Sequence, residues 1–95
     1  MVKVLAHFYF KEGVFDEVKL LASELVAKTQ AEDGCIQYEL IQANDDPLHM
    51  IMQEDWTTQA ALDAHCKTEH FLRLVPKLGE LCAKPGEAFK YTRFA

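Results

Sequence analysis

The residues of this 95-residue chain best suited to chemistry gather between positions 53 and 65. Trp56, the only tryptophan, ends an extended segment, and His65 follows nine residues later in a helical pattern. An imidazole titrates in the range useful for proton transfer, and an indole can stack on an aromatic ligand. Because strand-to-helix corners often border pockets, we take His65 as a candidate acid–base and Trp56 as a candidate pocket wall. A hydrogen-bonded buried histidine and a plain core ring are the alternatives.

Four more side chains are candidates for the same site. Glu54 precedes Trp56 by two positions, so both project from one face of a strand. Its carboxylate could orient a histidine, act as a base if burial raises its pKa, or pair with a basic residue. His7 and Tyr38 lie on separate predicted strands and could orient a substrate or shuttle protons. Met52 is a candidate for an adaptable apolar lining, or for plain core packing.

His70 and Phe71 are two further site candidates, and the residues around them include potential metal ligands. His70 and Cys66 are four residues apart, as are His65 and Glu69, and this spacing places side chains on one helical face. Two ligands are too few for a zinc site, so we predict no metal. We expect His70 to reach the pocket with Phe71. The chain contains no Gly-rich phosphate loop, nucleotide fingerprint or CxxC motif, so no bound cofactor is predicted.

Composition and charge narrow the classes of function. The chain is 49% hydrophobic and 26% charged, and its length fits one domain, which we expect to span residues 1–95. The net charge of −5 argues against nucleic-acid binding, which needs clustered Lys and Arg. No apolar run approaches the roughly 20 residues of a membrane span, and we see no signal peptide. Three irregularly spaced cysteines fit a reducing compartment, so we expect a cytoplasmic protein without membrane insertion.

The first half of the chain reads as strand, helix and hairpin. Alternating and β-branched residues predict strands, and apolar residues at helical spacing predict an amphipathic helix that the Asp33-Gly34 pair stops. Turn residues 44–47 join two strands into a hairpin. The predicted elements are a strand at Val2–Phe10, a helix between Val14 and Lys28, and strands at Cys35–Ala43 and His49–Trp56.

The second half reads as two helical pieces and a last strand. Thr57 or Thr58 can cap a short helix that runs to about Cys66, and Thr68 can cap a second helix. Pro76 predicts a kink or a late helix start. The apolar face of the second helix is predicted to consist of Phe71, Leu72, Val75, Leu78, Leu81 and Cys82. Pro85-Gly86 should end the helical region, and a last strand should follow at Ala88–Phe94.

The element order β-α-β-β-α-β predicts an α+β, ferredoxin-like fold, with an antiparallel sheet and helices on one side. The opposite sheet face then needs a cover. Because alternate residues on both faces of the strands are largely apolar, we expect a second copy of the chain to supply it, giving a homodimer.

Four motifs carry a resemblance to the antibiotic biosynthesis monooxygenase domain family, closest to its short stand-alone members of the quinol monooxygenase type. These motifs are Asp33-Gly34-Cys35-x-x-Tyr38, Asn44-Asp45-Asp46-Pro47, Glu54-x-Trp56-x-x-x-x-Ala61-Leu62-x-x-His65 and Thr68-x-His70-Phe71. The resemblance implies a dimeric α+β barrel with a pocket between helices and sheet in each subunit. It also implies oxidation of an electron-rich phenol or quinol by dioxygen without metal or flavin.

Departures from the family patterns refine this expectation. Heme-degrading relatives carry a second Trp where this chain has His65, a ligating His where it has Val75, and an Asn near His7, so heme degradation is not expected. Members that oxidise polycyclic phenols use an Asn where this chain has Met52, which puts that mechanism in doubt. Two alternatives to the quinol monooxygenase stay open: an isomerase of a small oxygenated metabolite, with or without a phosphate group, and a non-catalytic dimeric ligand-binding or stress-response module.

Overall fold

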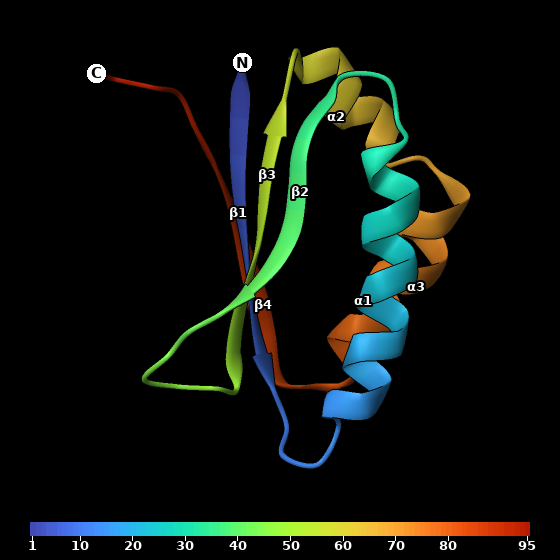
Figure 1. The fold of residues 1–95 in the computed structure, drawn as a ribbon, viewed down its shortest axis with the longest axis vertical. Coiled ribbons are helices and arrows are strands. Elements are labelled where there is room, and N and C mark those ends of the chain that lie inside the picture. Colours follow the sequence, from blue (N-terminus) through green and yellow to red (C-terminus); the bar gives the residue numbers. More distant parts are fainter.

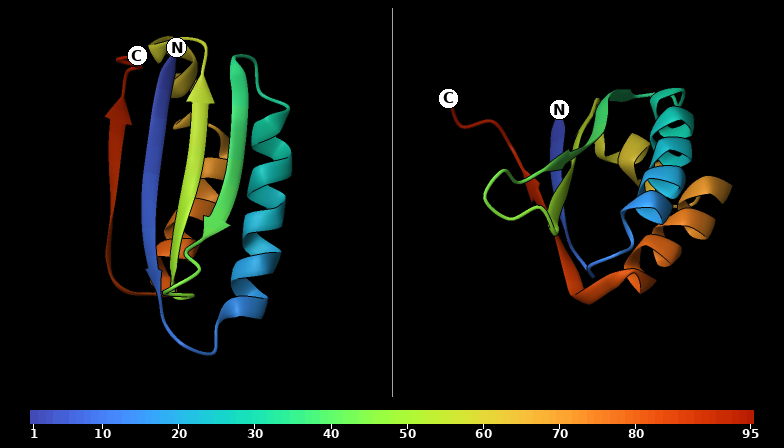
Figure 2. Two further views of the ribbon diagram at one scale, coloured as in Figure 1. Left: turned by 60° about the vertical axis from the view of Figure 1, so that its left-hand side comes forward. Right: turned by 60° about the horizontal axis from the view of Figure 1, so that its bottom comes forward.

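The computed structural model describes all 95 residues as a four-stranded antiparallel sheet with three helices on one face (Figures 1 and 2). The strand order is β2-β3-β1-β4. The elements in chain order are β1 Val2–Phe10, α1 Phe15–Gln30, β2 Cys35–Gln42, β3 His49–Trp56, α2 Gln59–His65, α3 Glu69–Glu80 and β4 Cys82–Tyr91. This is the ferredoxin-like β-α-β-β-α-β arrangement predicted from the sequence, with the second helical part in two pieces. None of the helices is long and apolar enough to cross a membrane.

Helix α1 forms where helical spacing predicts it. Val18, Ala22, Leu25 and Thr29 recur every three or four residues and are buried against β2 and α3. Acidic residues in its first turn and Lys28 in its last suit the helix dipole. The helix ends at Gln30, earlier than the predicted stop at Asp33-Gly34, so residues 31–34 form a loop, and this loop carries Glu32.

Helices α2 and α3 begin at the predicted caps. The side chains of Thr58 and Thr68 accept hydrogen bonds from the backbone N–H groups of Ala61 and Phe71, at 3.1 and 3.2 Å. Pro76 lies inside α3, so of the two predicted alternatives, a kink or a late helix start, the late start is excluded. The missing N–H of Pro76 deprives the carbonyl of Leu72 of its helical partner, and Leu72 is 61% exposed, so water can replace that partner.

The buried face of α3 differs from the predicted one at four positions, because Leu74 was not predicted on it and Leu72, Leu81 and Cys82 were. Leu74 and Leu78 are fully buried, whereas Leu72, which was expected on this face, is exposed. Positions 71, 74, 75 and 78 are three or four residues apart, so they lie on the side of α3 that faces the protein interior. Position 72 lies on the side that faces solvent. Leu81 is the C-cap and Cys82 begins β4, so neither belongs to the helix as predicted.

Strand β4 was predicted at Ala88–Phe94, but it begins six residues earlier and includes Pro85 and Gly86. An edge strand tolerates proline because its outer N–H groups have no strand partner. The register with β1 shifts between His7 and Tyr9, so Pro85-Gly86 form an irregularity opposite β1. A Cβ atom on Gly86 would lie 2.3 Å from the His7 carbonyl oxygen, so only glycine lets the two backbones approach this closely here.

The register aligns side chains in rows across the inner sheet face, which the helices cover. Directly paired residues on neighbouring strands project to the same face. One row consists of Tyr38, Glu54, Val4 and Lys90, and the next consists of Leu40, Met52, Ala6 and Ala88. The first row carries polar groups and the second is apolar, so the inner face presents a polar band beside an apolar floor.

Candidate active site

A cavity of about 490 Å³ lies between helices α2 and α3, the inner sheet face and strand β4. Its apolar walls come from both layers: Val4, Ala6, Phe8 and Met52 from the sheet, and Leu62, Phe71 and Val75 from the helices. Tyr38, Glu54 and His65 also border it. Six of the eight predicted site residues border the cavity, and five of them, Tyr38, Met52, Glu54, His65 and Phe71, lie on its inner-sheet or helix side, whereas the side chain of His7 projects to the outer sheet face. Their roles remain predictions.

His65 is the central polar group of the site. Its side chain is 1% exposed, and Nδ1 lies 2.8 Å from Oε2 of Glu32. A carboxylate only accepts hydrogen bonds, so Nδ1 carries the proton and Nε2 has a free lone pair. No protein group is bonded to Nε2. Burial lowers the pKa of His65, with Glu32 opposing this effect, so the neutral ring is favoured. Nε2 is therefore the ring nitrogen with a lone pair free to accept a proton, on a residue that borders the cavity.

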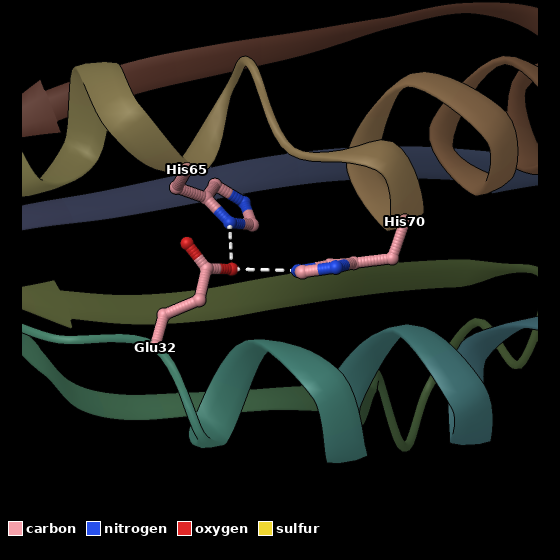
Figure 3. Close-up of side chains that lie close together, drawn as sticks. All are labelled: Glu32, His65 and His70. Atoms are coloured by element: carbon pink, nitrogen blue, oxygen red, sulfur yellow. Dashed lines mark hydrogen bonds and ion pairs between the residues drawn. The ribbon is translucent and has the colours of Figure 1, made fainter.

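Glu32 connects two histidines, as Figure 3 shows. Its Oε2 also lies 2.7 Å from Nε2 of His70, at the start of α3. His70 does not border the cavity, so it lies behind His65 and not in the pocket where it was expected. The two N–H groups on one oxygen fix the carboxylate, and the carboxylate fixes the His65 ring.

Sequence reasoning missed Glu32 and assigned the possible histidine-orienting role to Glu54. Glu32 stands 33 residues from His65 and 38 from His70, so no spacing rule connects them. The one available signal was that a buried imidazole needs a partner for its N–H group.

Gly34 allows the loop of Glu32 to approach α2. It has φ +83°, and a Cβ atom there would lie 2.5 Å from the Cβ of Ala61. Its carbonyl accepts a 2.8 Å hydrogen bond from the Thr57 N–H group, which attaches the loop to the β3–α2 corner. A side chain at position 34 would push the loop, and Glu32 with it, away from His65.

Glu32, His65 and His70 are also the residues that could hold a metal, since their ligand atoms lie within 4.8 Å of one another. The O–N contacts of 2.8 and 2.7 Å are hydrogen-bond lengths. Two ligands of one tetrahedral zinc ion would stand about 3.3 Å apart. The arrangement therefore fits a hydrogen-bonded pair of histidines on one carboxylate.

Glu54 is the second titratable group at the cavity. It is 6% exposed, and its Oε1 accepts a 3.0 Å hydrogen bond from Nε1 of Trp56. Burial raises the pKa of Glu54 to about 7, against the opposing effect of the Trp56 bond. Near neutral pH, Glu54 therefore exists in both protonation states and can give or take a proton.

The rings around His65 fix its plane. Trp56 is fully buried and does not border the cavity, so it supports Glu54 and His65 instead of forming the predicted stacking wall. Its ring centroid lies 4.7 Å from that of His65. Tyr38 and Phe71 meet His65 edge-on at 5.2 and 5.0 Å. Burial, together with the nearby Glu54, raises the pKa of Tyr38, so its hydroxyl stays protonated at the cavity.

His7 does not join this group. Its cross-strand partner is Ile51, on the outer sheet face, and its Nδ1 lies 2.9 Å from Nε2 of His49. The His7 ring also stacks with the rings of His49 and Tyr9. His7 borders the cavity only at the level of its strand, because alternation turns its imidazole away from the helices. The predicted relay role therefore has no support in its position.

The fold and the site define a small ferredoxin-like domain with a buried histidine and a buried glutamate at an apolar cavity. A sequence model of the family described as "Antibiotic biosynthesis monooxygenase" matches residues 1–77. The chain belongs to this antibiotic biosynthesis monooxygenase family, as the resemblance indicated.

Relatives and solved structures agree with this assignment. The chain is 30% identical over 84 residues to "Putative monooxygenase Rv0793" of Mycobacterium tuberculosis, covering 88% of this chain and 82% of that protein. It is 32% identical over 85 residues to "Putative monooxygenase YcnE" of Bacillus subtilis, covering 90% of each. A crystal structure of an antibiotic biosynthesis monooxygenase, 39% identical, superposes with a TM-score of 0.94 over 100% of both chains.

The raised pKa of Glu54 predicts a pH-dependent stability. In the folded state the pKa of Glu54 is about 7, whereas its ordinary value is 4.5. The stabilisation is therefore present below pH 4.5 and is lost as the pH rises through about 7. Glu54→Gln keeps an acceptor for Trp56 but cannot ionise. Its free energy of unfolding, relative to wild type, should rise by on the order of 1–3 kcal/mol from about pH 5 to about pH 8. Urea unfolding across this range measures it. The matched change at exposed Glu80 should give a flat difference, and a flat difference for Glu54→Gln would contradict the assignment.

Removal of the Glu32 charge should lower the pKa of His65 further, because Glu32 is the group that opposes the effect of burial. Titration of the His65 ring by NMR, in wild type and Glu32→Gln, measures this change. Asp33→Asn removes the neighbouring exposed charge and is the control, with no effect expected on His65. An unchanged His65 titration in Glu32→Gln would show that the two side chains are not paired in solution.

Proposed function

We propose that the protein is a monooxygenase that oxidises a quinol or a similar electron-rich phenol in the cavity, without a bound cofactor. The observation that carries the proposal is the free Nε2 of a neutral, buried histidine at an apolar cavity. The family and the names of its relatives support a monooxygenase-type role. The cavity walls are apolar enough to seat an aromatic ring, with Glu54 and Tyr38 as polar partners.

His65 would begin the reaction by accepting a hydroxyl proton of the quinol at Nε2. The developing imidazolium is stabilised by Glu32 through Nδ1–H, as in other histidine–carboxylate pairs. The quinol anion then passes one electron to dioxygen, and the resulting superoxide and substrate radical combine at a ring carbon. One C–O bond has now formed, and His65 returns its proton to the peroxide.

Completion of the reaction requires a second proton donor, and Glu54 fits that role. Loss of the hydrogen on the oxygenated carbon and cleavage of the O–O bond give a hydroxyquinone. Glu54 in its protonated form donates to the departing hydroxide, which leaves as water, and the proton taken from carbon restores it. One quinol and one dioxygen thus give one hydroxyquinone and one water. All four electrons come from the substrate, so no external reductant is needed.

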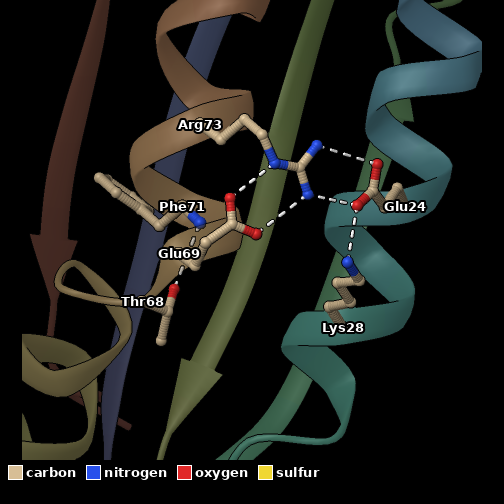
Figure 4. A network of polar contacts seen from close by, with 6 residues as sticks. All are labelled: Glu24, Lys28, Thr68, Glu69, Phe71 and Arg73. Carbon is tan, nitrogen blue, oxygen red and sulfur yellow. Dashed lines mark hydrogen bonds and ion pairs between the residues drawn. The ribbon is translucent and has the colours of Figure 1, made fainter.

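A phosphorylated substrate, as the isomerase alternative would use, finds little support. Arg73 is bound to Glu24 and Glu69 on the outer side of the helices (Figure 4). Neither Arg73, Lys77 nor Arg93 borders the cavity. The non-catalytic module would be favoured by a pocket filled with side chains, whereas about 490 Å³ is open.

We also propose that the protein acts as a homodimer formed through the outer sheet face. This face carries apolar side chains that no helix covers, including Ile41, Phe89 and Tyr91, which are 40%, 48% and 45% exposed. Exposed apolar groups gathered on one face favour association, most simply with two-fold symmetry.

Oxygen consumption with reduced quinones tests the proposed activity. We expect enzyme-dependent uptake above autoxidation, with His65→Ala slowing it by about 100-fold or more, because general base catalysis contributes on that order. Leu20→Ala, at a 73% exposed position of α1 away from the cavity and the outer sheet face, is the control and should retain the rate. If no quinol or phenol supports uptake above background, the monooxygenase proposal is wrong, and the isomerase and the binding module take its place.

The molar mass in solution tests the dimer. Light scattering at micromolar concentration should give twice the chain mass of 10.8 kDa. Ile41→Lys should shift the mass towards the monomer, because it places a charge in the apolar face. Leu20 on α1 is 73% exposed, and Leu20→Lys should leave the molar mass unchanged. A monomeric wild type would exclude the dimer.

A further inference from the structure

We propose that the substrate carries a carboxylate on the side of the ring away from the reacting hydroxyl, and that Lys90 binds it. This inference rests on the proposed function of the same cavity and names the class of substrate. It makes Lys90, a residue that no motif singled out, the group that determines specificity and orientation.

The sheet register places Lys90 at the opposite end of the cavity floor from the acid–base pair. Glu54 pairs with Val4 across β3 and β1, and Val4 pairs with Lys90 across β1 and β4. All three side chains therefore project to the inner face, and Glu54 and Lys90 both border the cavity. Their backbones are two strand spacings apart, about 10 Å. An aromatic ring with one substituent fits between the Glu54 and Lys90 side chains across this distance.

The floor between the two ends is apolar. Val4 lies in the row itself, and Ala6, Met52 and Ala88 form the next row. Phe71 and Val75 close the cavity from the helix side. An aromatic ring can lie on this floor, whereas a charged substituent finds a partner only at one of the two ends.

Lys90 is the only lysine or arginine that borders the cavity. It takes part in no hydrogen bond or ion pair within the chain, unlike Lys3, Lys28 and Arg73, which bind carboxylates. Two further acids border the cavity: Asp63, which accepts a 2.9 Å hydrogen bond from Gln59, and Glu87, whose cross-strand partner His7 projects to the outer sheet face. An unpaired ammonium on a flexible stem can cover apolar surface and bind a carboxylate at the cavity mouth.

The position of the one cation at the cavity selects the anion and its orientation. A single ammonium matches a monoanionic carboxylate better than a phosphate, which proteins usually bind with several donors. At the other end, burial and the carboxyl group of Glu54 disfavour an anion, and the free lone pair of His65 suits a neutral hydroxyl. A carboxylate held by Lys90 therefore turns the hydroxyl of the same ring towards His65.

Binding of two quinols that differ by one carboxylate tests the inference. The ligands are 2,5-dihydroxybenzoate and 1,4-dihydroxybenzene, titrated anaerobically by calorimetry into wild type, Lys90→Met, Lys90→Arg and Lys84→Met. Lys84 lies on the same strand with its ammonium 4.3 Å from the Tyr9 ring centroid, away from the cavity, so its variant matches the charge change.

We expect wild type to bind the carboxylated quinol roughly three- to tenfold more tightly, the scale of a partly exposed ion pair. Lys90→Met should abolish this preference, while Lys90→Arg and Lys84→Met retain it. The preference should also shrink as salt rises from about 50 mM to about 500 mM.

Three outcomes would overturn the inference: equal affinity for both ligands in wild type, a preference that survives in Lys90→Met, or no binding of either compound. The results are separable from the proposed activity. A carboxylate preference without oxygen uptake would retain the Lys90 site and reject the monooxygenase. Uptake with neutral quinols and no preference would reject the Lys90 site alone.

Discussion

The site depends on one buried hydrogen bond, from Nδ1–H of His65 to Glu32. An imidazole that is 1% exposed loses the hydration of its charged form, so the neutral ring is favoured and its single N–H needs an acceptor. A hydrogen bond to a charged group contributes about 1.5–3 kcal/mol, and a missing partner would leave a buried donor unsatisfied. The loop between α1 and β2 supplies that acceptor, and Gly34 lets the loop come close enough to do so. Once Nδ1 is bonded, Nε2 is the remaining nitrogen, and it has no partner within the chain, while His65 as a residue borders the cavity.

The sheet supplies the other half of the arrangement through its register. Pairing of β1 with both β3 and β4 aligns Glu54, Val4 and Lys90 in one row, so three residues far apart in the chain share one face. A shift of one residue in either pairing would turn such side chains to the outer face. The irregularity at Pro85-Gly86 ends the regular β1–β4 register next to the cavity, and the absence of a side chain on Gly86 lets the two strands stay in contact there. Backbone pairing therefore determines which polar groups a ligand can meet.

The elements could be predicted where periodicity is local, and the site could not where contacts are long-range. Strands β1 and β3, helix α1 and the caps Thr58 and Thr68 follow from patterns within a few residues. Strand β4 was placed too late because Pro-Gly usually marks a turn, and only an edge position makes it tolerable in a strand. The face of His7 could not be assigned, since both faces of β1 are largely apolar. Glu32 was missed because its two partners lie in other elements, and nothing in its local sequence marks it.

Burial shifts the pKa values of the two titratable groups at the cavity, Glu54 and His65, in opposite directions. It raises the pKa of Glu54 from 4.5 to about 7 and lowers that of His65 from its ordinary value of 6.5. Proton exchange between such groups and a hydroxyl near neutral pH needs little driving force. The same desolvation makes each charged form unfavourable, and the protein offsets this with one bond to each side chain, from Trp56 to Glu54 and from His65 to Glu32. The partners in these two bonds, Trp56 and Glu32, do not border the cavity, so its interior stays open for a ligand. Trp56 and Glu32 therefore shape the chemistry of the site without bordering the cavity, and variants at either position should act through the pKa values of their partners.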